Sequence, residues 1–241
     1  MKTKTFITSD SHFYHSNMIT WKNMPKRYLF NSQSGIEKGS PDFSTEILMS
    51  DTLRMNETLI SNWNSVVGKN DLVYHLGDVA FASANKIREI IERLNGNIFL
   101  ITGNHEKWKV LKNIKDLFVG IDIYKEINYQ YNDETYHICM FHNPIAPNCW
   151  DRSHYGSIHA HGHSHGAFKG FKGVEKEILD IFSELNLSNQ QKDAYLSRLN
   201  LNNGKMVDVG VDTDLANFYP ILMEDLIDYT KGLNYTKNVD L

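Results

Sequence analysis

Apolar residues follow two spacings along the first hundred residues, and this pattern predicts alternating strands and helices. Three short apolar runs are typical of buried strands: residues 2–9, 71–78 and 97–104. Two longer segments carry apolar residues every three or four positions and are predicted to be amphipathic helices: residues 42–67 and 83–96. Because strands and helices alternate, the first half is predicted to be an α/β core with parallel strands.

The second half has a different pattern, which predicts an antiparallel or mixed sheet. Residues 123–143 contain two β-rich runs around Asn132-Asp133, a pair typical of a hairpin turn. Two more strands are predicted in "GSIHAHGHSH" and "GKMVDVGVD". The remaining predictions are helical structure within 173–200, a short helix at 223–233 and a mobile polar loop at 31–42.

Composition adds few constraints beyond an ordinary globular protein. The chain has 241 residues, enough for one sizeable domain, with 41% hydrophobic and 22% charged residues. The formal net charge of -4 gives no basic excess for nucleic-acid binding. The two cysteines, Cys139 and Cys149, are too few for a disulfide framework. No secretion signal or membrane-length apolar run is seen, so we expect a single cytoplasmic domain over residues 1–241.

Metal-ligand residue types follow the ends of five successive predicted strands. They lie in the blocks Asp10-Ser11-His12, Gly77-Asp78, Gly103-Asn104-His105-Glu106, His142-Asn143-Pro144 and Gly162-His163-Ser164-His165. Ligands of open α/β sheets collect at the carboxyl ends of the strands, so these blocks are predicted to meet. Residues i and i+2 of an extended chain project to the same side, which would let Asp10 and His12 face one point.

The mixture of donor atoms predicts two metal ions. Two aspartates, one asparagine and four histidines suit a borderline divalent metal such as Mn, Fe, Zn, Ni or Co better than Ca or Mg. Seven protein ligands are too many for one catalytic ion with an open position, whereas two ions that share a carboxylate accommodate them. We therefore predict two divalent metal ions as cofactors, with Mn as the first choice.

The five blocks resemble, in order and spacing, the signature blocks of the calcineurin-like metallophosphoesterase superfamily. Similarity to a subgroup of small bacterial and phage phosphoesterases extends to "MNETLISNWNSVV" and "VDVGVD", and covers about residues 4–166 and 205–225. The resemblance implies an α/β fold of two packed mixed β-sheets flanked by helices, a four-layer α/β/β/α sandwich. Compared with that subgroup, this chain carries a helical insertion at about 167–204.

The resemblance also implies roles for the site residues. It divides the ligands between two metal ions: Asp10, His12 and His165 for one, Asn104, His142 and His163 for the other, and Asp78 as the bridge. His105 would stand beside the metals as a proton donor or charge stabiliser for the leaving group. The implied reaction is phosphate-ester hydrolysis, in which a metal-bridging hydroxide attacks phosphorus in line with the leaving oxygen.

Several residues outside the ligand set have more than one interpretation. Arg152 lies between two blocks and could clamp a substrate oxygen, although a solvated loop arginine is an equally good interpretation. Asn17 follows the first block and could reach the pocket. Lys26 and Arg27 are interpreted as surface residues, and His75 as a hydrogen-bonded core histidine.

Three functions are compatible with this set of residues. The leading hypothesis is a binuclear metal-dependent hydrolase, a phosphatase or phosphodiesterase, acting on a small phosphoester or nucleotide because basic residues are not in excess. A nuclease or nucleotide phosphohydrolase with the same site chemistry is the first alternative, since a metal pair supplies local positive charge. A protein-interaction scaffold on the same fold is the second alternative, and the complete ligand set disfavours it. A structural zinc protein is disfavoured because neither cysteine lies in a block.

Overall fold

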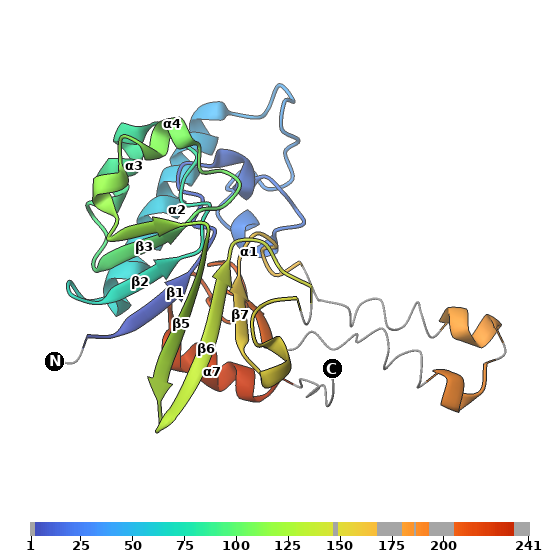
Figure 1. The fold of residues 1–241 in the computed structure, drawn as a ribbon. Helices are drawn as coiled ribbons and strands as arrows, with labels where there is room; N and C mark the ends of the chain where they lie inside the picture. The colour runs from blue at the N-terminus through green and yellow to red at the C-terminus, as the bar shows by residue number, and fades with distance from the viewer. Residues whose placement is uncertain (1–2, 147–148, 168–179, 186, 193–204, 234–241) are drawn as a thin grey trace.

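The first sheet is mainly parallel and carries the first three predicted strands. The structure is a computed structural model and describes residues 3–146, 149–167, 180–185, 187–192 and 205–233 (Figure 1). The strand order is β4-β3-β2-β1-β9. The strands are β1 (Thr5–Thr8), β2 (Leu72–His75), β3 (Asn97–Ile101), β4 (Gly120–Asp122) and β9 (Ile221–Leu222). Strands β1 to β4 run parallel and β9 runs antiparallel to β1, which confirms the parallel core predicted from the alternation.

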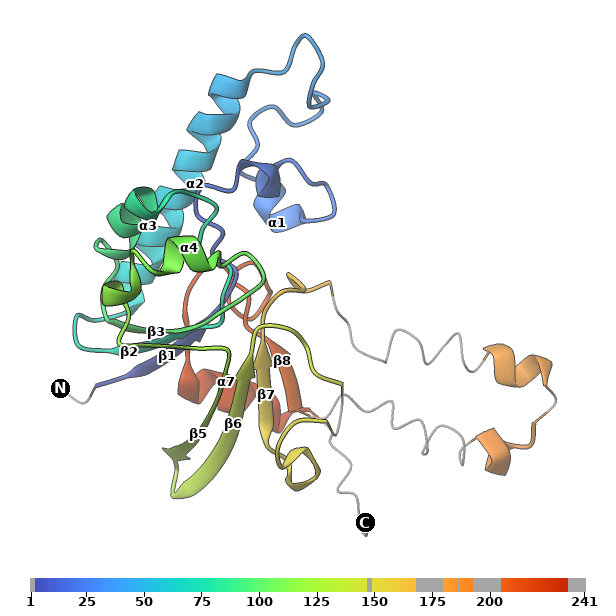
Figure 2. The ribbon, with the colours of Figure 1, turned by 45° about the horizontal axis from the view of Figure 1, so that its top comes forward.

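Helices cover the outer face of this sheet (Figure 2). The two long predicted helices are present as α2 (Thr45–Val66) and α3 (Ala84–Ile91). Helix α2 begins at Ser44, whose side chain accepts a hydrogen bond from the Ile47 backbone N–H, and it buries a stripe that includes Met55 and Trp63. The shorter helices are η1 (Ser16–Ile19), α1 (Pro25–Tyr28), α4 (Trp108–Leu111) and η2 (Lys115–Leu117). No helix among the described residues is long and apolar enough to cross a membrane.

The second sheet is mixed, with the order β5-β6-β7-β8. Its strands are β5 (Tyr124–Tyr131), β6 (Glu134–Phe141), β7 (Ile158–His161) and β8 (Lys205–Asp208), and η3 (Ser153–Tyr155) precedes β7. The predicted hairpin is formed by antiparallel β5 and β6. Its turn residues Asn132 and Asp133 have φ of 48° and 62°, the left-handed conformation that a two-residue hairpin turn requires. Strands β6, β7 and β8 are parallel.

The two sheets pack face to face around an apolar core that lies between them. Ile7 from the first sheet and Ile138 and Ile158 from the second are fully buried in it. Helix α7 (Met223–Lys231), predicted at 223–233, adds Leu226 to the same core. The sheets are also joined by backbone, because Ser9 forms a parallel bridge with Gly210 immediately beyond β8. The predicted fold of two packed mixed sheets with flanking helices is therefore confirmed.

Two predicted segments remain: the structure describes the first only in part, and the second is held in place at one residue. Of the helical insertion predicted at 167–204, residues 168–179, 186 and 193–204 lie outside the described residues; 180–184 and 189–192 are helical. The polar loop predicted to be mobile at 31–42 is anchored near its start, because the Gln33 side chain exchanges two hydrogen bonds with the Ser44 backbone.

Leu226→Ala tests whether α7 closes the core between the sheets. Leu226 is fully buried, so its truncation is expected to lower the free energy of unfolding by about 2–5 kcal/mol through lost burial and a residual cavity. Urea denaturation measures this change. The control on the same helix is Tyr229→Ala, an exposed position where the effect should stay within about 0.5 kcal/mol. Equal effects of the two substitutions would contradict this packing.

Candidate metal centre

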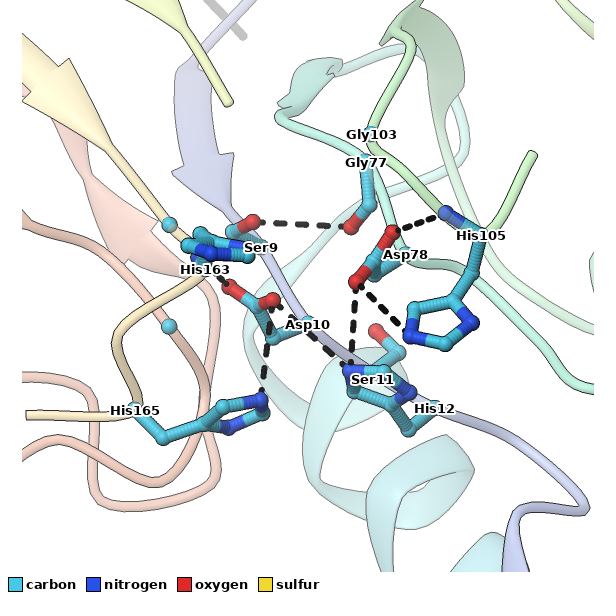
Figure 3. A network of polar contacts seen from close by, with 12 residues as sticks. Ser9, Asp10, Ser11, His12, Gly77, Asp78, Gly103, His105, His163 and His165 are labelled. Atoms are coloured by element: carbon cyan, nitrogen blue, oxygen red, sulfur yellow. Dashed lines mark hydrogen bonds and ion pairs between the residues drawn. The ribbon is translucent and has the colours of Figure 1, made fainter. Parts of the chain in front are cut away.

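The seven predicted ligand residues lie together where the strands of both sheets end. Figure 3 shows five of them: Asp10, His12, Asp78, His163 and His165. Six of them form two clusters: Asp10 with His12 and His165, and Asp78 with His142 and His163. Within each cluster the candidate donor atoms lie within 4.8 Å of one another. Asn104 joins the second cluster, since its Oδ1 lies 3.0 Å from His142 Nε2 and 2.9 Å from His163 Nδ1.

The first cluster is built around a fully buried carboxylate. Oδ2 of Asp10 accepts a hydrogen bond from the His163 backbone N–H at 2.9 Å. Oδ1 lies 3.8 Å from Nε2 of both His12 and His165. Burial acts to raise the pKa of Asp10, but the surrounding histidines outweigh it and hold this pKa well below its usual range. The carboxylate is therefore ionised at neutral pH.

Asp78 lies between the two clusters. Its Oδ2 is 3.5 Å from Nε2 of His12 and 3.5 Å from Nε2 of His142. Nδ1 of His142 donates to the Leu76 carbonyl at 2.7 Å, so its Nε2 is turned toward Asp78. Burial lowers the pKa of His142, but Asp78 and Asp10 together raise it to about 9. A cation shared by the two clusters would contact Asp78.

The donor set fits divalent metal ions. Asp10 Oδ1 and His12 Nε2 are buried and have no hydrogen-bond partner among the described residues, although both face the centre of the site. Buried polar atoms of this kind are costly unless a ligand satisfies them. Nitrogen and oxygen ligands of one ion lie about 3–3.5 Å apart, close to the 3.5–3.8 Å separations in these clusters. A metal ion between them would satisfy both atoms.

The ligand side chains are oriented by left-handed backbone conformations and not by an extended chain. Five of the seven have positive φ, between 46° and 69°: Asp10, His12, Asp78, His163 and His165. The i and i+2 argument for Asp10 and His12 was therefore wrong in its reason, because the strand ends at Thr8 and the chain turns at each ligand. Such strained conformations concentrate at functional sites, where the surrounding structure enforces them.

Two glycines allow the loops to approach this closely. Gly77 has φ of 95°, and a Cβ there would lie 2.3 Å from the Gly103 backbone nitrogen. A Cβ on Gly162 would lie 2.2 Å from the Asp10 carboxylate. Any side chain at either position would displace a ligand loop.

Glu106 ties two ligand loops together and was not singled out from the sequence. Its carboxylate accepts hydrogen bonds from the backbone N–H groups of Asp78, Val79 and Gly103 at 2.6–2.9 Å. Burial raises the pKa of Glu106, while these donors act in the opposite direction. Its position directly after His105, in the same block, was the available signal.

Arg27 corrects the prediction of a surface residue. It is fully buried, and its Nε donates to Asp212 Oδ2 at 2.9 Å. Its Nη atoms donate to the backbone carbonyls of Asp10 and Ser11. Asp212 in turn lies 2.9 Å from Nδ1 of His165, and although burial acts to raise the pKa of Asp212, Arg27 and His165 lower it to about 2. This series of hydrogen bonds from Arg27 through Asp212 orients the His165 ring, as a carboxylate does behind a metal-bound histidine.

His105 lies at the open side of the centre. Its backbone N–H donates to Asp78 Oδ1 at 2.9 Å, and its Nε2 lies 3.8 Å from Asp78 Oδ2. One third of the side chain is exposed, unlike the buried His12 and His142. His75 agrees with its interpretation as a core histidine, since it is buried and its Nε2 lies 2.8 Å from Ser11 Oγ.

The two predicted substrate-binding residues form no hydrogen bond or ion pair with the ligands among the described residues. Arg152 is at the amino end of β7, beside Asp151, which contacts His137 in the middle of β6. His137 is five residues from His142, about 16 Å along a strand, so a clamp by Arg152 is not supported. Asn17 is exposed on η1, and its Oδ1 accepts a hydrogen bond from Lys38.

The two packed mixed sheets and the candidate ligands at the ends of their strands define an α/β protein with a candidate metal site. The family model for calcineurin-like phosphoesterases matches residues 3–168, and the chain belongs to this family. The uncharacterized protein MJ1445 from Methanocaldococcus jannaschii is 38% identical over 107 residues, 44% of this chain. That match spans about half of the relative, 48% of its length. A protein of unknown function from Aquifex aeolicus, AQ665, shares the fold at 19% identity, with a TM-score of 0.54 over 95% of this chain and 100% of that chain.

Arg27→Met tests the buried support behind His165. The substitution leaves the Asp212 carboxylate buried without its cation, which is expected to lower the free energy of unfolding by about 3–5 kcal/mol. Urea denaturation in the presence of a chelator measures the loss. Lys26→Met is the adjacent control: Lys26 pairs with the fully exposed Asp214, so about 0–1 kcal/mol is expected. Similar losses for both variants would refute a special role for Arg27.

Proposed function

We propose that this protein is a metal-dependent hydrolase of phosphate esters that uses two divalent ions. The strongest support is the position of Asp78, whose Oδ2 lies 3.5 Å from a histidine of each cluster. Membership of the calcineurin-like phosphoesterase family supports the reaction class. The orphaned atoms of Asp10 and His12 support a cation as the missing partner.

The proposed ligand assignment follows the two clusters. One ion would be held by Asp10, His12 and His165, and the other by Asn104, His142 and His163, with Asp78 contacting both. Two bound divalent ions supply an activated water and neutralise charge on the phosphoryl oxygens. The mixed oxygen and nitrogen donors suit manganese, which we propose as the metal.

The chain itself orients these groups. The Leu76 carbonyl fixes the His142 ring, and Asp212 with Arg27 fixes the His165 ring. Each of these hydrogen bonds engages Nδ1 and so directs Nε2 of the ring toward the proposed cation.

His105 is proposed to transfer the proton to the leaving oxygen. It is held beside Asp78 by its own backbone N–H, yet it keeps an exposed ring edge. A histidine in this position can donate a proton to an ester oxygen as the bond to phosphorus breaks.

An apolar cavity beside His105 supports a small ester with an aromatic or apolar leaving group. The cavity has a volume of about 210 Å³, and its walls include Phe81, Leu100, Val110 and Ile114. A flat apolar group, such as a nucleobase or a phenyl ring, would bury its faces there. We therefore favour a small phosphoester or nucleotide as the substrate.

Metal add-back tests the proposed reaction. Metal-stripped protein is expected to hydrolyse p-nitrophenyl phosphate or its bis-ester only after Mn, Ni, Zn, Co or Mg is restored. Asp78→Asn removes the shared charge and should abolish this metal-dependent turnover. Absorbance of released p-nitrophenol measures the rate, and the ratio of diester to monoester rates defines the preferred substrate class. Folded, metal-loaded protein without turnover above the Asp78→Asn variant would favour the scaffold hypothesis instead.

His105→Ala tests the proposed proton donor. Loss of general acid catalysis is expected to lower kcat by about 10²–10⁴-fold without changing the metal content. Steady-state kinetics and elemental analysis measure the two quantities together. His154→Ala is the control, because His154 lies in η3 at the opposite end of the second sheet and should retain full activity. An unchanged kcat in His105→Ala would remove His105 from the reaction.

A further inference from the structure

A second group of metal-type side chains lies on the outer face of the hairpin sheet. His137 and Cys139 are on β6, and Glu126 is on β5, directly opposite Cys139 in the strand register. Ile138, between the two β6 residues, points into the core between the sheets. Because side chains alternate along a strand, His137 and Cys139 project to the other face. Asp151 reaches this face from the connection between β6 and β7.

The donor atoms of this group are spaced as ligands of one ion. Those of Glu126, His137 and Cys139 lie within 4.8 Å of one another. Nε2 of His137 is 3.1 Å from Asp151 Oδ2 and 3.6 Å from Glu126 Oε2. The edge of a tetrahedron of nitrogen and oxygen ligands around zinc is about 3.4 Å. The donor atoms of Glu126, His137 and Cys139 are thus close enough to hold one ion, and Asp151, beside His137, is the nearest candidate for a fourth ligand.

His137 directs its Nε2 toward the carboxylates of the group. Its Nδ1 lies 2.9 Å from Asn128 Oδ1, an acceptor, so Nδ1 carries the hydrogen and donates it. The neutral ring then has its lone pair on Nε2. That Nε2 is buried and has no hydrogen bond of good geometry among the described residues. Metal-binding histidines likewise have one nitrogen fixed by a hydrogen bond and the other directed at the ion.

The chemistry of the four side chains favours zinc. Cys139 contributes a buried sulfur, His137 an imidazole nitrogen, and Glu126 and Asp151 carboxylate oxygens. Thiolate and imidazole together favour zinc over manganese, magnesium and calcium. The side chains of Glu126 and Asp151 are about one third and one half exposed, which leaves an entry path for the ion.

We propose that Glu126, His137, Cys139 and Asp151 bind a zinc ion that is separate from the metal pair of the phosphoesterase centre. Four protein ligands leave no open position, so the ion would have a structural role. It would tie the connection at Asp151 to the β5–β6 hairpin. That connection begins just after His142 and leads into β7, which is followed by His163, so the ion would fix the spacing of two central ligands.

Cobalt substitution separates this site from the centre. A thiolate bound to Co²⁺ gives a charge-transfer band in the near ultraviolet, and neither cysteine is among the seven ligands of the centre. Stripped full-length protein titrated with Co²⁺ is expected to develop this band, and Zn²⁺ should abolish it. Asp78→Asn, which impairs only the centre, should keep the band.

Matched cysteine variants identify the sulfur. Cys139→Ser should lose the band and hold one equivalent less zinc, while Cys149→Ser, an exposed cysteine, should retain both. His137→Ala should weaken the band and the zinc affinity, with circular dichroism used to verify the fold. A wild-type protein that binds cobalt without the band would overturn the proposal. So would a band that is lost in Cys149→Ser but kept in Cys139→Ser. The wild-type result is independent of how well the variants fold.

Discussion

The burial of Asp10 is the constraint on which the rest of the site depends. A carboxylate that is fully removed from water is costly unless charges and hydrogen bonds around it compensate. The backbone N–H of His163 and the rings of His12 and His165 provide part of this compensation. Arg27 contributes from behind, through the backbone carbonyl of Asp10 and the carboxylate of Asp212. The remaining oxygen, Oδ1, has no hydrogen-bond partner among the described residues. It is therefore available to bind a cation.

The position of Asp10 follows from the way the sheets join. Ser9 bridges β1 to the chain beyond β8, so the residue after it lies at the seam between the two layers. The backbone N–H of Asp10 also donates to the Gly77 carbonyl at 3.0 Å, which brings the loop after β2 to the same seam. Parallel β1, β2 and β3 end at one edge, and parallel β6 and β7 end beside them. Residues far apart in sequence converge because both sheets direct their carboxyl ends to one place.

The periodic pattern and the strand-end blocks were enough to predict the parallel core, the hairpin and the group of seven residues. Arg27 and Asp212 were missed because a charged residue on a four-residue helix has no periodicity that reveals burial, and its partner is 185 positions away. The position of Arg152 was predicted wrongly for a different reason. It lies between two blocks in sequence, but the connection between parallel β6 and β7 must return to the far end of the sheet before β7 begins. Sequence proximity indicates spatial proximity only when the connection does not cross the sheet.

The two groups of donors differ in a way that would let one chain sort its metals. Ligands of the centre are oxygen and nitrogen atoms, with one carboxylate, Asp78, placed between two sets of histidines. The outer group adds the sulfur of Cys139 to the donors of Glu126 and His137, and Asp151 lies 3.1 Å from the His137 ring nitrogen. Sulfur favours zinc, and a closed four-ligand geometry suits a structural ion, whereas the proposed shared site of carboxylate, amide and imidazole donors suits a borderline divalent metal and would leave room for substrate. If both sites were chemically alike, the more strongly binding metal would occupy both. A thiolate in the outer group alone would give the proposed zinc a separate site, and metal availability would then set the proposed pair at the centre.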